Sequence, residues 1–212
     1  MMSGLFLTFE GIEGVGKTTQ LQKLVTWLSE RDVPVILTRE PGGTAFGQQL
    51  RSIILDPSTR FHSKYTEIMM FMADRLEHVA GVMEPAIRDG KVVLCDRFID
   101  STVAYQVGGR GLPADFVEGL HSLLPLRPDF TILLDVEPEE GLARARGRAK
   151  LDRFEQETMA FHRRVRAKYL EIAESEPRRV SVVSTTQLNV DTVFDRILDI
   201  VTPILNRSGH SL

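Results

Sequence analysis

The fold is decided by residues 5–18, LFLTFEGIEGVGKT. The first part, residues 5–9, is a short apolar run of the kind that forms a buried strand. The second part, residues 11–18, is glycine-rich and matches the pattern Gly-x4-Gly-Lys-Thr, which joins a strand to a helix and binds phosphate. Helical spacing follows at Leu21, Leu24, Val25 and Leu28. The segment therefore predicts a strand, a phosphate loop and a helix in that order.

Apolar runs alternate with helical patterns along the rest of the chain. Further strands are expected at 33–38, 91–95, 130–134 and 180–183. Helices are expected at 45–55, 66–88, 113–124, 138–146, 155–175 and 190–205, with a turn at 108–111. Apolar strands that alternate with helices predict a three-layer α/β fold, in which helices cover both faces of a five-stranded parallel sheet. Ligands of such folds bind beyond the carboxyl ends of the strands.

Length and composition narrow the class of protein. The 212 residues suit a single domain, 1–212. A net charge of −3 gives no overall basic field, which argues against a nucleic acid polymer or a membrane as the main partner. The lone cysteine, Cys95, excludes a disulfide framework, and the sequence shows neither a signal segment nor a run of ~20 apolar residues. These observations predict a cytoplasmic protein.

The glycine-rich loop predicts an ATP site. Its backbone N–H groups would surround a phosphate, Lys17 would reach the β and γ oxygens, and the Thr18 hydroxyl would bind Mg²⁺. Asp96, at the end of an apolar strand, is the expected second Mg²⁺ ligand. Asp135 has a similar setting, but strand-end aspartates often serve turns, so we interpret Asp135 as a turn or helix cap. The expected ATP-binding residues are Gly11, Ile12, Glu13, Gly14, Val15, Gly16, Lys17, Thr18 and Thr19.

Arginines near the expected crevice point to a second phosphate group. Arg97 directly follows Asp96 and is placed to bind it. Two unit charges ~4 Å apart repel by about 1 kcal/mol in water and by more in a partly desolvated site, so several cations are needed. Further candidates are Arg39, Arg51 and the run Arg144, Arg146, Arg148, Lys150 and Arg153. That run could be a solvated helix face, but only Asp152 balances its five cations in an otherwise acidic chain.

The chain resembles thymidylate kinases along nearly its whole length. The motifs that carry the resemblance are GIEGVGKTT at 11–19, REPGGT at 39–44, FMADR at 71–75, DRFIDSTVAYQ at 96–106, GGRG at 108–111 and LDRFE at 151–155. The resemblance implies a phosphate-loop fold like that of nucleoside monophosphate kinases, with a small mobile lid at about residues 144–154. It further implies a homodimer that uses Mg²⁺ and transfers the γ-phosphoryl group of ATP to dTMP, giving dTDP and ADP for dTTP synthesis.

The resemblance also implies roles for the substrate residues. Phe71 would stack on thymine, and Arg75, one helical turn later, would donate to a ring carbonyl. From spacing alone, Phe71 would be an ordinary core residue. Gln106 would pair with the base edge, and Glu13 would accept from the 3′-hydroxyl group. Ser101, Thr102 and Tyr105 would line the sugar and base pocket, and Arg39, Arg51 and Arg97 would hold the acceptor phosphate.

One position departs from the pattern of some thymidylate kinases, which carry an arginine immediately after the acid of the loop. This chain has Gly14 there. The resemblance then implies the bacterial-type arrangement, in which the lid supplies the missing charge, and Arg148 and Arg153 are the favoured lid residues. The expected catalytic residues are therefore Lys17, Arg97, Arg148 and Arg153.

Two other functions stay open at this point. A kinase for another monophosphate or for a deoxynucleoside would share the loop, but a nucleoside kinase needs a base to activate a neutral 5′-hydroxyl group. A monophosphate, with a second pKa of about 6, is already ionised near neutral pH, so positioning and charge stabilisation suffice. A nucleotide-dependent switch also begins with such a loop, but the guanine-reading string Asn-Lys-x-Asp does not occur in the sequence.

Overall fold

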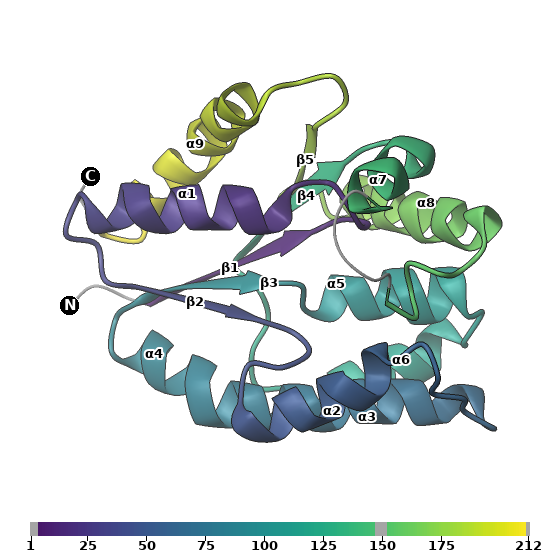
Figure 1. Cartoon of the computed structure of the whole chain (residues 1–212). Coiled ribbons are helices and arrows are strands. Elements are labelled where there is room, and N and C mark those ends of the chain that lie inside the picture. Colours follow the sequence, from purple (N-terminus) through teal and green to yellow (C-terminus); the bar gives the residue numbers. More distant parts are fainter. Residues whose placement is uncertain (1–3, 147–151, 211–212) are drawn as a thin grey trace.

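The computed structural model describes residues 4–146 and 152–210. Five parallel strands form one sheet between layers of helices, which confirms the predicted fold class (Figure 1). The order of the strands across the sheet is β2-β3-β1-β4-β5. Their bounds are β1 (Leu5–Glu10), β2 (Val35–Arg39), β3 (Val92–Asp96), β4 (Phe130–Asp135) and β5 (Val180–Ser184).

Helices cover both faces of the sheet. Figure 1 shows α1 (Lys17–Ser29) and α9 (Val190–Arg207) on one face, and α3 (Lys64–His78), α4 (Glu84–Arg88) and α6 (Ala114–His121) on the other. The other α-helices are α2 (Ala45–Leu55), α5 (Ile99–Thr102), α7 (Pro138–Arg146) and α8 (Met159–Ser175). Two π-helical segments are η1 (Val79–Met83) and η2 (Val103–Gly109). In the part of the chain that the structure describes, no helix has the length and apolar character to cross a bilayer.

The core divides between the two faces because successive side chains of a strand point to opposite sides. Leu7 and Phe9 of β1 belong to the cluster that includes α1, α8 and α9. Phe6, directly before Leu7, points to the opposite side and packs in a second cluster with Ile68 and Met72 of α3. β1 thus packs against helices on both faces of the sheet, and these contacts fix the position of its carboxyl end.

Local capping signals set where several helices begin. Thr44, Ser63, Thr158 and Asn189 precede α2, α3, α8 and α9, and each side chain accepts a hydrogen bond from a backbone N–H group of the first turn. The expected helices at 45–55 and 138–146 match α2 and α7. The expected helix at 66–88 corresponds to α3, η1 and α4 in succession, with a wider π-helical turn in the middle.

Two expected elements need correction. The predicted turn at 108–111 begins only at Arg110, because Gly108 and Gly109 belong to η2, which the sequence reading missed. The helix expected at 155–175 starts at Met159, since the backbone N–H groups of residues 154 and 155 both donate to Asp152 Oδ1 and hold a turn there.

The strand register brings several polar residues to one edge of the sheet. Asp96, the last residue of β3, lies beside Phe9 of β1 and beside Arg39, the last residue of β2. The phosphate loop follows β1 directly. The carboxyl ends of three neighbouring strands therefore deliver the loop, an acid and an arginine to one place.

Candidate active site

The phosphate loop joins β1 to α1 as expected. Gly16 precedes α1 in a left-handed conformation with φ 94°, and Lys17 is the first residue of the helix. The Lys17 side chain is buried and turns back over the loop, where Nζ donates to the carbonyl oxygens of Gly11 (2.9 Å) and Ile12 (3.0 Å). Burial and the charge of Arg97 lower the pKa of Lys17 to about 8 against the opposing effect of nearby acids.

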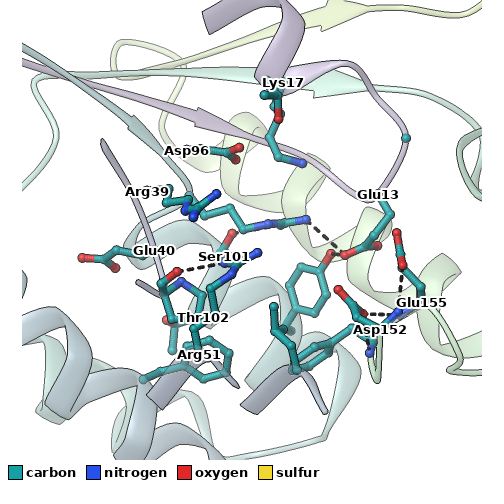
Figure 2. A pocket seen from close by; sticks show the side chains of 18 of the residues that line it. Glu13, Lys17, Arg39, Glu40, Arg51, Asp96, Ser101, Thr102, Asp152 and Glu155 are labelled. Atoms are coloured by element: carbon teal, nitrogen blue, oxygen red, sulfur yellow. Dashed lines mark hydrogen bonds and ion pairs between the residues drawn. The ribbon is translucent and has the colours of Figure 1, made fainter. Parts of the chain in front are cut away.

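A pocket opens beside this loop at the carboxyl edge of the sheet. Figure 2 shows Lys17, Asp96 and Glu13 around the same hollow as Arg39 and Arg51. The structure brings all the predicted substrate-binding residues to its wall, together with five of the loop residues. These are Glu13, Arg39, Arg51, Phe71, Arg75, Arg97, Ser101, Thr102, Tyr105 and Gln106, with Gly14, Gly16, Lys17, Thr18 and Thr19. The loop residues Gly11, Ile12 and Val15 are buried behind it.

Arg97 is a pocket-lining residue that several protein groups hold in place. Its backbone has φ 71°, an unusual conformation for a residue with a side chain, and its N–H donates to Phe9 at 3.0 Å. The guanidinium group donates to Glu13 Oε1 (3.1 Å), Ser101 Oγ (3.2 Å) and the Tyr169 hydroxyl (3.1 Å). Protein acceptors on two sides thus fix the cation in place.

Glu13 remains ionised in this pocket. Oε1 accepts from the Tyr105 hydroxyl (2.5 Å) as well as from Arg97, and His162 Nδ1 lies 3.5 Å from Oε2. Burial alone would raise the pKa of Glu13, but His162, the charges of Arg97 and Lys17, and the Tyr105 hydroxyl lower it to about 2. A buried carboxylate beside the loop can accept a hydrogen bond from a sugar hydroxyl group.

Phe71, Arg75 and Gln106 also line the pocket, and Arg75 and Gln106 are buried. Phe71 is half-buried, and its ring centroid lies 6.1 Å from that of Phe154. The Arg75 guanidinium group is buried and donates to Glu40 Oε2 (2.6 Å), Thr102 Oγ1 (2.9 Å) and the Phe98 carbonyl (3.0 Å). These residues offer an aromatic face and fixed polar groups, which suits a planar heterocycle.

Two further arginines line the pocket near its opening. Arg39 is exposed and has no hydrogen bond or ion pair within the described residues. Arg51 donates to the Pro41 carbonyl at 2.8 Å, and burial together with the charge of Arg39 lowers its pKa. With Arg97, these side chains give the pocket a cationic wall opposite the loop, as expected for a second phosphate group.

The residues present fit a Mg²⁺ ion that is bound together with phosphate. Asp96 Oδ1 is buried without a hydrogen-bond partner in the parts of the chain described, and the exposed Thr18 lines the same pocket. Across residues 4–146 and 152–210, no group of three His, Cys, Asp or Glu side chains could hold a metal by itself. An ion here would need phosphate oxygens and water for its remaining ligands, which is typical of Mg²⁺.

Of the two favoured lid arginines, the structure describes Arg153 alone and does not bring it to the loop. Arg148 lies outside the described residues. Arg153 lines a neighbouring hollow, where its Nη2 pairs with Glu67 Oε2 (2.6 Å) and its Nε donates to the Ile54 carbonyl (2.8 Å). A catalytic role for either arginine therefore stays a prediction.

Gly14 has a physical reason for lacking a side chain. Its φ of 75° is left-handed, and a Cβ atom there would lie 1.9 Å from the carbonyl oxygen of Gly141. Gly141 belongs to α7, so this helix packs directly on the loop. An arginine at position 14 would have to displace α7, and the loop itself has no room for an added cation.

Sequence reasoning missed three side chains of the site. Glu10 is buried at the end of β1 and accepts from Phe98 N (2.7 Å) and the Tyr169 hydroxyl (3.0 Å). Burial, then the charge of Asp100, raises the pKa of Glu10 to about 7. An acid that ends an apolar strand was a usable signal for Glu10. His162 and Tyr169 come from α8, far along the chain, and no local pattern marks them.

Comparisons with known proteins show which family the chain resembles along its length. Residues 9–197 match the family model described as thymidylate kinase. A thymidylate kinase of Symbiobacterium thermophilum is 43% identical over 205 residues, which cover 96% of this chain and 95% of that protein. One of Trichormus variabilis is 46% identical over 96% of this chain and 98% of its own. The crystal structure of thymidylate kinase from Ehrlichia chaffeensis superimposes with a TM-score of 0.77 at 32% identity, covering 94% of this chain and 99% of that one.

Proposed function

Since this chain belongs to the thymidylate kinase family, we propose that it transfers the γ-phosphoryl group of ATP to dTMP and releases dTDP and ADP. The observation that carries the proposal is the position of Arg97. Its guanidinium group lines the pocket that also holds the phosphate loop and Phe71, Arg75 and Gln106, and it donates to Glu13 of the loop. Such an arrangement holds two phosphate groups in line and a planar base beyond them.

The chain's own residues act by positioning and by charge stabilisation. Lys17 exchanges the carbonyl oxygens of Gly11 and Ile12 for oxygens of the β- and γ-phosphates when ATP binds. Arg39, Arg51 and Arg97 hold the acceptor phosphate and offset its repulsion from the donor. The acceptor oxygen is already ionised near neutral pH, so no general base is required.

Asp96 and Thr18 would hold Mg²⁺, which when bound neutralises charge on the transferring phosphates. Glu13 accepts from the 3′-hydroxyl group of the deoxyribose, which suits its low pKa. Arg148 and Arg153 add positive charge from the lid expected at about residues 144–154 of the single domain, as the family resemblance implies. For Arg153 this requires release from Glu67.

The chain also has a surface that suits the homodimer implied by the family resemblance. Exposed apolar side chains lie on the adjoining helices α2 and α3, namely Phe46 and Ile53 on α2, and Tyr65, Met69 and Leu76 on α3. Apolar side chains gathered on neighbouring helices are typical of an interface between subunits. The cytoplasmic location expected from the sequence stays a prediction.

An assay of ADP release with different acceptors tests the proposed function. With ATP and Mg²⁺, we expect turnover with dTMP and little with thymidine, because thymidine brings no phosphate to the three arginines. Faster turnover with thymidine would favour a deoxynucleoside kinase. Nucleotide hydrolysis that does not respond to any acceptor would favour a switch protein.

A further inference from the structure

In the side-chain amide of Gln106, the nitrogen makes a hydrogen bond and the oxygen makes none within the described residues. The residue is 1% exposed and lines the pocket with Phe71 and Arg75. Its nitrogen Nε2 donates to Glu67 Oε1, whereas its oxygen Oε1 is buried and has no hydrogen-bond partner among the described residues. Buried polar atoms are nearly always paired, so an unpaired oxygen in a pocket-lining side chain indicates a donor on the ligand.

Glu67 acts on this amide without lining the pocket. It lies on α3, one helical turn before Phe71 and two before Arg75, and its side chain is buried. Its oxygens accept from Arg110 Nε (3.1 Å) and Nη2 (3.3 Å), and Oε2 pairs with Arg153 Nη2 (2.6 Å). The carboxylate is therefore held from several sides in the hollow next to the pocket.

The chemistry of Glu67 determines which way the Gln106 amide faces. A carboxylate that pairs with two guanidinium groups can only accept hydrogen bonds. The part of Gln106 that faces Glu67 must therefore be the NH₂ group, because a carbonyl oxygen there would be repelled. The amide oxygen is left for the base.

We propose that Glu67 is a positioning residue that fixes Gln106 as a hydrogen-bond acceptor toward the base and so selects pyrimidines that carry N–H at ring position 3. Thymine and uracil have that donor. Neutral cytosine has an unprotonated nitrogen there, which repels the amide oxygen and leaves both acceptors unpaired. The inference rests on the proposed function and adds a residue outside the pocket that enforces the choice against cytosine.

The test compares three acceptors in wild type and in Glu67→Gln. An amide at position 67 can donate as well as accept, so the amide of Gln106 is free to turn. We expect the ratio of kcat/KM for dTMP to that for dCMP to fall at least about tenfold, the size of one mismatched buried hydrogen bond. The ratio for dTMP to dUMP should stay constant, because both bases carry the same N–H group. If Glu67 only stabilised the folded structure, the substitution would lower kcat/KM for all three acceptors together.

Glu157→Gln is the matched control. Glu157 also pairs with Arg110, but it makes no recorded contact with Gln106, so the dTMP to dCMP ratio should not change. A folded Glu67→Gln variant with the wild-type ratio would overturn the inference, as would an equal fall in the control. Lack of dTMP turnover by the wild-type chain would instead refute the proposed function.

A double variant covers the case in which Glu67→Gln alone does not fold. Glu67→Gln combined with Gln106→Glu keeps one carboxylate and one amide and exchanges their places. Residue 106 then still presents an acceptor oxygen to the base, so we expect preference for dTMP over dCMP to persist. Loss or reversal of that preference in the folded double variant would contradict the inference. Thermal unfolding measures whether each variant is folded.

Discussion

The acceptor half of the pocket and its donor half differ in how far the protein satisfies its own polar groups. In the acceptor half, Arg75 and Arg97 each donate to at least three protein groups and are held in place. In the donor half, Lys17 bonds to carbonyls of its own loop, and Asp96 Oδ1 has no partner in the described part of the chain. Arg75 and Arg97 of the acceptor half are thus held in place before a ligand binds, although Gln106 Oε1 awaits a donor. Lys17 and Asp96 of the donor half gain their partners from the ligand.

This difference predicts which variants lower kcat and which raise KM. Changes in the donor half remove interactions that form only with the transferring phosphate and should lower kcat. Changes at the base-binding residues of the acceptor half, such as Phe71, remove binding that is already complete with the acceptor and should raise its KM.

Lys17→Met should have the largest effect. We expect kcat to fall about 10²–10³-fold, the usual result of removing one charge-stabilising donor, with little change in the KM for dTMP. Steady-state kinetics measure both constants. Lys23→Met, on the same helix at an exposed pair with Asp191, is the control and should behave as wild type. A Lys17→Met kcat within about tenfold of wild type would contradict the assignment of Lys17.

Phe71→Ala should have a smaller effect, and on the KM for dTMP instead of on kcat. Loss of a stacking face is worth about 1–3 kcal/mol, so the KM for dTMP should rise about tenfold while kcat changes little. Phe116→Ala is the control, since Phe116 contacts Tyr65 on α3 outside the pocket. An unchanged KM for Phe71→Ala would return Phe71 to the role of a core residue.

Asp74→Asn should have the smallest effect, and its effect on the free energy of unfolding should depend on pH. Asp74 Oδ1 accepts from Gly42 N at 2.9 Å, whereas Oδ2 is buried and unpaired within residues 4–146 and 152–210. Burial, then the charge of Glu40, raises the pKa of Asp74 from 3.8 to about 6. The folded state therefore binds this proton more tightly than the unfolded state, and wild type loses stability as pH rises between these values.

Asparagine keeps the acceptor oxygen and does not titrate. The free energy of unfolding of Asp74→Asn relative to wild type should increase by about 1–2 kcal/mol between pH 4 and pH 6, as measured by urea unfolding. Glu77→Gln, an exposed acid on the same helix, is the control and should show no such trend. A difference that is constant with pH would show that Asp74 titrates normally.

Local patterns predicted much of the fold and of the donor half. The phosphate loop follows a strand and begins a helix, so its whole geometry lies within one short stretch. Among the expected substrate residues, Arg39 ends β2 and Arg97 follows β3, whereas Phe71 and Arg75 share one face of α3. For the loop and for these residues, position within one strand or helix determines where the side chain lies.

The parts that could not be predicted depend on contacts between distant segments. The π-helical segment η2 packs on α8, and its own sequence carries no capping signal. Tyr169 reaches Arg97 across 72 positions of the chain. The pairing of Arg153 with Glu67 likewise joins residues far apart, and a basic run in the sequence does not specify which acid it meets.

The contact between Gly14 and Gly141 also limits how this enzyme can evolve. An arginine codon at position 14 would force α7 away from the loop before the new cation could contribute to catalysis. A Cβ atom on Gly141 would in turn lie 2.6 Å from the Glu13 carbonyl oxygen. Substitutions at residues in contact are not independent, so the first step toward a loop-borne arginine would be harmful without a second. Descendants of this sequence should therefore keep both glycines or change them together.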